Sequence, residues 1–235
     1  DLYLNRVFGE LAPSPIKGEV VKIRRVACPK GRFFESSDFD YVILIKSAEN
    51  PSRLVKILHV APVVDVGEPV YPGQDLGFLL RSGYFNFWTD PHVHVEVRNL
   101  SDPLRARGGF EIKRLRKIGK MKPLTELRGT VIRVKPEYSL ISLNDTFEGG
   151  IYADVEDSGV LLDAGIPHYG RIGIHTNDEP PIQGYVKLCG KTIGMMESTR
   201  NNIGLARCSN FGFRLGKTRV GLSLYLHLSS KPLIK

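Results

Sequence analysis

Thr89-Asp-Pro-His-Val-His-Val-Glu-Val-Arg98 (TDPHVHVEVR) is the stretch around which the rest of the chain is interpreted. Successive side chains of a β-strand point to opposite faces. A strand here places His92, His94 and Glu96 on one face and the valines on the other. The valine face can be buried, and the other face presents two imidazoles, the commonest metal-ligating side chains. The same spacing also fits a half-exposed sheet edge with solvated histidines.

Short β-branched runs and frequent turn signals surround this stretch. Strands are predicted on both sides of the first turns, at 18–25, 41–47 and 53–60, the last of which carries His59. The glycines at 67, 73 and 77 indicate tight turns, because glycine adopts positive φ without strain. Nothing between them is typical of a long helix. We therefore expect an all-β fold.

Length and composition indicate a folded protein of one large or two small domains. The chain has 235 residues, of which 42% are hydrophobic, and no apolar run approaches the roughly 20 residues of a membrane span. It does not begin with Met, so a preceding segment could belong to the protein. We expect a first domain at 1–109, a basic junction at 110–123 and a second β-rich domain at 124–235.

The formal charge of +8 favours an anionic partner. Basic residues concentrate between Arg105 and Lys122, which we interpret as an exposed junction that could contact such a partner. The chain has no nucleic-acid-binding motif beyond this charge, which argues against nucleic acid. Three widely spaced cysteines, Cys28, Cys189 and Cys208, argue against a disulfide framework and favour free thiols in a cytoplasmic protein.

The second half contains two short echoes of the first. Residues 67–77 resemble 165–173, and residues 15–20 resemble 181–186. These matches suggest that the second domain is a divergent repeat of the first, although chance similarity between glycine-rich turns explains them equally well. The echo has no second His-x-His, so any chemistry is expected in the first domain.

Residues 13–103 resemble the lysostaphin-type zinc metallopeptidases, which mostly cut peptide cross-links of bacterial cell walls. The resemblance rests on Pro91 to Arg98, on the turns between Gly67 and Gly77, and on the position of His59 before them. It implies a flattened β-sandwich of the duplicated hybrid motif type. It also implies a cell-envelope location, in contrast to the cysteine usage.

The resemblance assigns roles to individual residues. It implies that His94 binds zinc, while His92 and His59 position the attacking water and stabilise the oxyanion. A catalytic zinc takes about three protein ligands, and the family supplies two of them from an upstream His-x-x-x-Asp motif. That motif is incomplete here: Asp1 lies where its aspartate is expected, and a histidine three or four residues before Asp1 would complete the site. Glu96 is either an acceptor that holds His94 or a solvated carboxylate.

The loop before the histidine strand is rich in aromatic residues. Tyr84, Phe87 and Trp88 are expected either to wall a groove beside the histidines or to cover the core.

The resemblance thus implies a zinc-dependent peptidase with peptide or peptidoglycan as its substrate. The alternative is an inactive peptidase-like domain that keeps the groove and binds a peptide, glycan or protein. The incomplete ligand set favours the alternative, and retention of His59, His92 and His94 favours the enzyme.

Overall fold

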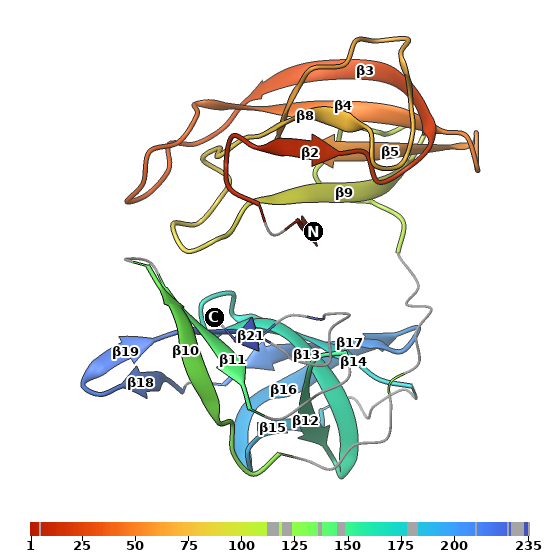
Figure 1. The fold of residues 1–235 in the computed structure, drawn as a ribbon. Coiled ribbons are helices and arrows are strands. Elements are labelled where there is room, and N and C mark those ends of the chain that lie inside the picture. The colour runs from red at the N-terminus through yellow and green to blue at the C-terminus, as the bar shows by residue number, and fades with distance from the viewer. Residues whose placement is uncertain are drawn as a thin grey trace. The chain divides into compact units, whose positions relative to one another are not determined.

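The computed structural model describes residues 1–4, 6–111, 118, 124–135, 138–144, 149–177, 183–209, 211–224, 226 and 233–234. Their regular elements are all strands, which confirms the predicted all-β fold (Figure 1). No helix capable of spanning a membrane occurs among these residues. The chain divides into two compact units, Asp1–Ile112 and Lys113–Lys235. Most of the basic segment from Arg105 to Lys122, and with it the predicted anionic contact, lies outside the described residues.

The first unit contains two antiparallel sheets. The larger has the order β1-β9-β5-β4-β3-β7 and the smaller the order β2-β8-β6. Figure 1 shows β2 and β8 lying across the sheet that contains β3, β4, β5 and β9. The strands are β1 Leu2–Tyr3, β2 Leu11–Pro13, β3 Gly18–Ala27, β4 Phe39–Ser47, β5 Arg53–Leu58, β6 Val60–Pro62, β7 Pro69–Val70, β8 Asp75–Leu79 and β9 His92–Asn99.

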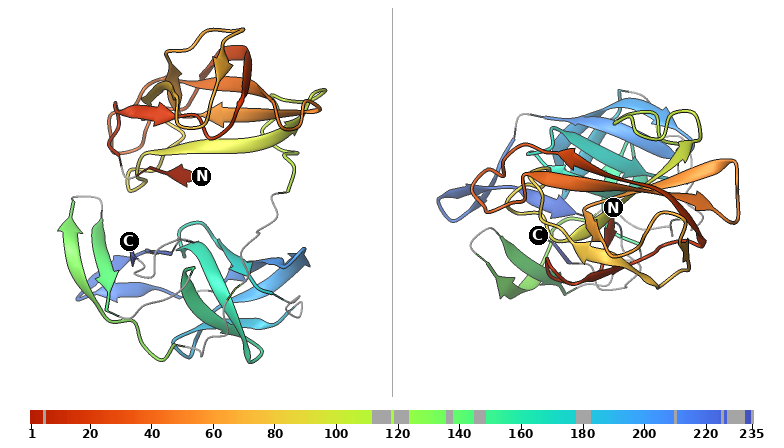
Figure 2. Two further views of the ribbon diagram at one scale, coloured as in Figure 1. Left: turned by 45° about the vertical axis from the view of Figure 1, so that its right-hand side comes forward. Right: turned by 90° about the horizontal axis from the view of Figure 1, so that it is seen from above.

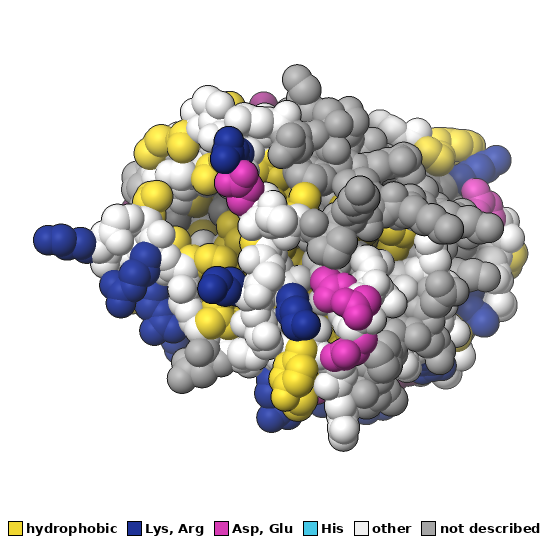
Figure 3. Space-filling model, turned by 90° about the horizontal axis from the view of Figure 1, so that it is seen from below, with side chains coloured by type: hydrophobic (Ala, Val, Ile, Leu, Met, Phe, Trp, Pro, Cys, Tyr) yellow, Lys and Arg dark blue, Asp and Glu magenta, His cyan; other side chains and the backbone are white. Residues whose placement is uncertain are grey.

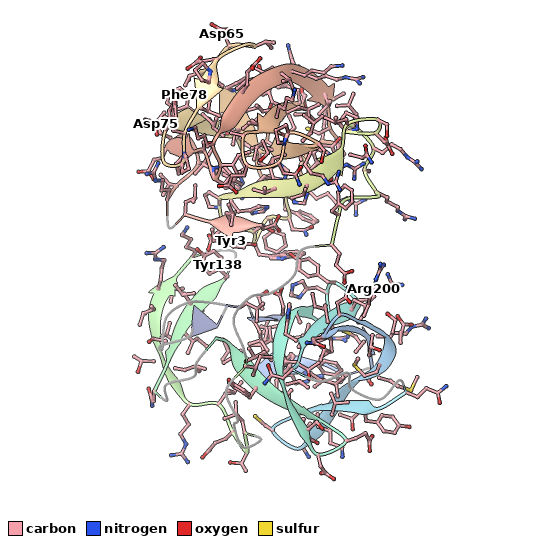
Figure 4. The ribbon with its side chains drawn as sticks, turned by 90° about the vertical axis from the view of Figure 1, so that its right-hand side faces the viewer. Tyr3, Asp65, Asp75, Phe78, Tyr138 and Arg200 are labelled. Atoms are coloured by element: carbon pink, nitrogen blue, oxygen red, sulfur yellow. The ribbon has the colours of Figure 1, made fainter. Side chains whose placement is uncertain are left out.

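The main core of this unit fills the space between the two sheets. Large-sheet residues such as Ile43, Ile57 and Val93 meet Leu76 and Leu79 of the small sheet. Burial of each of these side chains stabilises the fold by roughly 1.5–3 kcal/mol, before the loss of conformational entropy on folding is subtracted. On β8 the neighbouring side chains Asp75 and Phe78 point outward (Figure 4). Core and outer side chains are therefore separated on β8, although buried and exposed positions do not alternate strictly along it.

The other face of the large sheet carries the histidines. Leu58 pairs with His94 and Lys56 with Glu96, so these side chains share a face. The intervening residues Val93 and Val95 belong to the core. The predicted alternation along the histidine strand is therefore confirmed. A smaller apolar cluster of Val42, Leu44 and Leu54 lies on the histidine side.

The predicted strand at 53–60 is interrupted at His59, and this corrects the sequence interpretation. His59 has φ of 68° and lies between β5 and β6, which pair with different strands. A non-glycine residue in this region costs about 1–2 kcal/mol unless its surroundings compensate. The break carries the chain from the large sheet to the small one, so His59 occupies a corner of the sandwich.

The second unit has a different architecture. Six of its strands form a closed ring in the order β13-β12-β15-β16-β17-β14, because β14 also pairs with β13 (Figure 2). Each of the six contributes to one core, through Ile151, Leu162, Ile172, Val186, Met196 and Ala206. The strands are β10 Gly129–Val134, β11 Ser139–Leu143, β12 Ile151–Val155, β13 Ser158–Ile166, β14 Arg171–His175, β15 Tyr185–Leu188, β16 Lys191–Arg200, β17 Ile203–Cys208, β18 Phe213–Leu215, β19 Thr218–Val220, β20 Leu222–Leu224 and β21 Leu233–Ile234.

This ring does not match the expectation that the second domain repeats the first sandwich. The first unit has an open sheet with β1 and β7 at its edges, whereas the ring has none. The echoed residues 165–173 run from the end of β13 into β14. In the second echo, 181–186, the described residues 183–186 lead into and begin β15. The echoes therefore reflect similar turn chemistry, which glycine and proline impose on many β-folds.

The surface carries scattered basic side chains, and the three cysteines are partly buried. Figure 3 shows Lys and Arg side chains at several separate places on one face of the molecule. Cys28, Cys189 and Cys208 are free thiols, as expected. Burial raises the pKa of the Cys189 and Cys208 thiols, which keeps both in the protonated and less reactive form.

Candidate functional site

Three histidines from two segments meet on the outer face of the large sheet. The ring centroid of His59 lies 5.2 Å from that of His92 and 6.1 Å from that of His94. The two histidines of β9 are separated by one pleat repeat, and the corner between β5 and β6 brings the third to them. The structure thus places together the three histidines that the sequence singled out.

Asp1 joins this group through β1. Residues Leu2 and Tyr3 pair with Val93 and His92, so the first residue of the chain lies beside the histidine strand. Figure 4 shows Tyr3 on this short strand next to β9. The Oδ1 atom of Asp1 is 2.7 Å from Nδ1 of His94 and 3.7 Å from Nε2 of His92. A carboxylate oxygen and two imidazole nitrogens therefore converge.

The second ring nitrogen of His94 is held by Glu96. Its Nε2 atom lies 3.0 Å from Oε1 of Glu96, which also accepts a hydrogen bond from Nζ of Lys56 at 3.1 Å. The other carboxylate oxygen accepts from Nη1 of Arg98 at 3.2 Å. Burial opposes ionisation of Glu96, but the hydrogen bonds from Lys56 and His94 outweigh it and lower the pKa. Glu96 is therefore an anion that accepts the Nε2 proton of His94.

Arg98 fixes the Glu96 carboxylate in place. It is fully buried, and its guanidinium also donates to the carbonyl oxygens of Asp102 and Arg107 at 2.9 Å each. A buried arginine needs such partners, because transfer of its charge from water into the protein interior costs on the order of several kcal/mol. The loop after β9 is thereby tied to the same carboxylate that orients His94.

In His92 the proton lies on the other ring nitrogen from that in His94. Its Nδ1 atom lies 3.0 Å from the carbonyl oxygen of Asp90, which can only accept a hydrogen bond. Nδ1 therefore carries the proton, and Nε2 is the nitrogen nearer Asp1. Burial lowers the pKa of His92 to about 4, although the Asp90 hydrogen bond opposes this shift. At neutral pH His92 is a neutral imidazole with a lone pair on Nε2.

His59 is oriented by Asp40, a residue that the sequence interpretation did not select. Its Nδ1 atom lies 2.6 Å from Oδ2 of Asp40, and its backbone N–H donates to Oδ1 at 2.9 Å. Ser82 Oγ donates to Oδ2 at 2.6 Å and Tyr41 N–H to Oδ1 at 2.7 Å. The available signal was an aspartate at the start of an otherwise apolar strand, but its partners are distant in sequence.

The aromatic loop meets the histidines through a different residue from those expected. The buried ring of Phe85 lies 4.6 Å from His59 and 4.8 Å from His92 between centroids. Tyr84 donates to the carbonyl oxygen of Ala27, and Phe87 packs against Trp88 and Phe33. Among the described ring contacts of this loop, those with the histidines come from Phe85, while Tyr3 of β1 also packs on His92 with centroids 5.0 Å apart. The expected wall of Tyr84, Phe87 and Trp88 stays a prediction.

The aromatic loop is packed tightly against the loop that precedes β4. A Cβ atom on Gly83 would lie 1.5 Å from the carbonyl oxygen of Pro29, so no larger residue fits without displacing backbone. We expect Gly83→Ala to destabilise the first unit by about 1–3 kcal/mol, as overpacking typically does. Denaturant unfolding followed by fluorescence of Trp88, the single tryptophan of the chain, measures this change. Gly109→Ala is the control, since its Cβ would meet neighbours no closer than 3.7 Å.

The donor set fits a metal ion only in part. The described residues contain no group of three or more His, Cys, Asp and Glu side chains arranged to hold a metal. The paired atoms Asp1 Oδ1 and His94 Nδ1 are of the types that zinc prefers, and Glu96 supplies the outer acceptor that zinc-ligating histidines usually have. Two atoms of suitable type therefore lie together, whereas a catalytic zinc takes about three protein ligands.

Comparison with known proteins adds little on function. A family described as "Domain of unknown function (DUF8155) N-terminal domain" matches residues 1–114. The solution structure of lysostaphin matches with a TM-score of 0.29 and 13% sequence identity, covering 87% of this chain and 84% of that one. A similarity of this size is too weak to support an assignment. No curated protein matches.

Proposed function

We propose that the first unit is the hydrolytic domain of a zinc-dependent peptidase that acts on peptides, with cell-wall peptide as the substrate class. The observation that carries the proposal is the pairing of Asp1 Oδ1 with His94 Nδ1 at 2.7 Å. Glu96 already holds the opposite nitrogen of the His94 ring. The two atoms lie at hydrogen-bond distance from each other, and they would become neighbouring ligands if a zinc ion replaced the proton between them.

Asp1 and His94 are the residues that would hold zinc. Bound zinc would supply a water of lowered pKa and a Lewis acid for the amide carbonyl. Glu96, whose pKa is lowered by Lys56 and His94 and which also pairs with Arg98, fixes His94 with its proton on Nε2. A third ligand must come from another protein group or from solvent, because the described residues supply no set of three.

His92 and His59 are suited to handle the proton of an attacking water. Both carry the Nδ1 proton toward a fixed acceptor, the Asp90 carbonyl for His92 and the Asp40 carboxylate for His59. In its neutral form each ring therefore has a lone pair on Nε2, which accepts a hydrogen bond. This favours orientation of water over donation to an oxyanion, and it refines the two roles that the family resemblance implies.

The loops beside the histidines are suited to bind the substrate. Tyr84 is exposed, and Phe87 packs edge-on against Trp88 in the same loop as Phe85. Aromatic rings give extended peptides both apolar area and hydrogen-bonding groups, so we place substrate selection in these residues.

Metal binding tests the proposal directly. The full chain should take up about one zinc ion, and His94→Ala should abolish that uptake, because one of the two described ligands is lost. Glu96→Gln should weaken affinity by roughly 10- to 100-fold, the usual effect of removing an outer acceptor. Calorimetric titration and metal analysis provide the measurements. His59→Ala is the matched control in the same site and should retain zinc, since His59 is bound to Asp40 and is not a ligand.

A peptide-binding domain without catalysis is the second candidate. It is favoured by the incomplete set of metal donors among the described residues. If the full chain takes up no zinc and cleaves neither peptides nor purified peptidoglycan, while Trp88 fluorescence changes on addition of these ligands, the binding role replaces the peptidase.

A further inference from the structure

The buried carboxylate of Asp40 joins three separate segments of the first unit. It is fully buried and accepts hydrogen bonds from Tyr41 in its own strand, from His59 at the corner after β5, and from Ser82 in the aromatic loop. Four donors surround its two oxygens: two backbone N–H groups at Oδ1, and the imidazole and hydroxyl at Oδ2. A carboxylate satisfied in this way is held rigidly in one orientation.

The same contacts explain the backbone of His59. Its φ of 68° is unfavourable for a residue with a side chain, yet its N–H and its ring both bind one carboxylate. Backbone strain of this kind persists where surrounding contacts over-determine it, and it is frequent at functional sites. The geometry fixes the position of the imidazole and also its tautomer, since an ionised carboxylate can only accept the Nδ1 proton.

We infer that Asp40 is a positioning residue that keeps Nε2 of His59 free to accept a proton from the attacking water. The reaction it serves rests on the proposed function. In that reaction the water proton passes to Nε2 as the water oxygen bonds to the carbonyl carbon. The Nδ1 proton stays between His59 and Asp40, and the Nε2 proton then passes to the leaving nitrogen as the carbon–nitrogen bond breaks. No oxidant or other co-reactant is needed.

Ser82 links this pair to the aromatic loop. Its hydroxyl donates to the same Oδ2 atom that His59 uses, and Phe85 three residues later packs on the His59 ring. The loop that faces the substrate is therefore attached to the residue that orients His59. Ser82 supports the position of Asp40. The tautomer of His59 is set by Asp40, because the described hydrogen bond of the Ser82 hydroxyl goes to the carboxylate and that of the imidazole Nδ1 goes to the same carboxylate.

Nitrogen-15 NMR of the full chain with labelled histidine tests the inference without reference to activity. His59, assigned by comparison with His59→Gln, should show the Nδ1–H tautomer at neutral pH. In Asp40→Asn the side-chain NH2 group can donate a hydrogen bond to Nδ1 of His59 in place of the carboxylate oxygen that accepts one. The imidazole proton should then move from Nδ1 to Nε2. A wild-type His59 in the Nε2–H form would overturn the inference, and this measurement holds even if Asp40→Asn does not fold.

Hydrolysis of purified peptidoglycan peptides tests the catalytic part. Asp40→Asn should lower kcat by roughly 10³- to 10⁴-fold, as the wrong histidine tautomer does in hydrolases with this type of pair. KM and zinc content should stay close to the wild-type values. Ser47→Ala, which removes a hydroxyl that accepts the Asn50 N–H in an exposed turn, should keep both the tautomer and the activity. A tautomer change with unchanged kcat would overturn the inference. Absence of hydrolysis in the wild type would instead overturn the proposed function, and the NMR result would still decide the role of Asp40.

Discussion

Arg98→Met should lower the free energy of unfolding of the first unit by about 3–5 kcal/mol, the range seen when one partner of a buried charge pair is removed. The guanidinium of Arg98 is fully buried and binds Glu96 and two carbonyl oxygens. Methionine fills similar volume but donates no hydrogen bond. Of the two buried cations that bind Glu96 among the described residues, Lys56 would remain, and the loop after β9 would lose the hydrogen bonds from Arg98.

Denaturant unfolding followed by Trp88 fluorescence measures this effect in the first unit alone, because Trp88 is the single tryptophan. Arg105→Met is the matched control. Arg105 also pairs with a carboxylate, Asp102 at 3.5 Å, but its side chain is 76% exposed, so its removal should change stability by about 1 kcal/mol or less. Equal effects of the two substitutions would contradict the importance of the buried network.

The variant also separates two roles of Arg98. If Arg98 mainly supports the loop, zinc affinity should be unchanged in protein that remains folded. If it mainly keeps Glu96 positioned against His94, the affinity should fall with stability, as for other residues behind a metal ligand. The network thus connects the stability of β9 to the orientation of the proposed metal ligand.

Much of this site could be predicted from sequence because strand alternation is local. The period of two along residues 92–98 places both histidines and Glu96 on one face, whichever strands lie beside them. The flanking apolar runs likewise predict β4 and β5. The all-β class follows from these runs and from the spacing of the turns.

The missed features depend on contacts between distant residues. Asp40 and His59 are 19 positions apart and Asp40 and Ser82 are 42 apart, and no local pattern relates them. The break at His59 was missed because nothing in the run RLVKILHV marks a residue with positive φ. The closed ring of the second unit was missed because closure depends on the pairing of β13 with β14, which similar turns do not specify.

Acidification should destabilise the first unit well before its carboxylates are protonated, because His92 is buried in its neutral form. Its pKa is lowered to about 4 by burial, against an ordinary value of 6.5. Between these values the unfolded chain binds a proton that the folded protein does not, so stability falls as the pH falls. The difference corresponds to roughly 3 kcal/mol lost between pH 7 and pH 4. Asp40 and Glu96 act in the same direction at lower pH, since their pKa values are also lowered in the folded state.

Unfolding curves monitored by Trp88 fluorescence from pH 4 to pH 8 measure this dependence. His92→Gln should flatten the profile between pH 4 and pH 6.5, because glutamine does not titrate, while the loss of stability below that range should remain. Asp65→Asn, which changes an exposed carboxylate at a turn of the same unit (Figure 4), should leave the profile unchanged. A wild-type profile that is flat down to pH 4 would mean that folded His92 takes up its proton as readily as the unfolded chain. The neutral Nε2 lone pair assigned to His92 beside Asp1 would then be wrong.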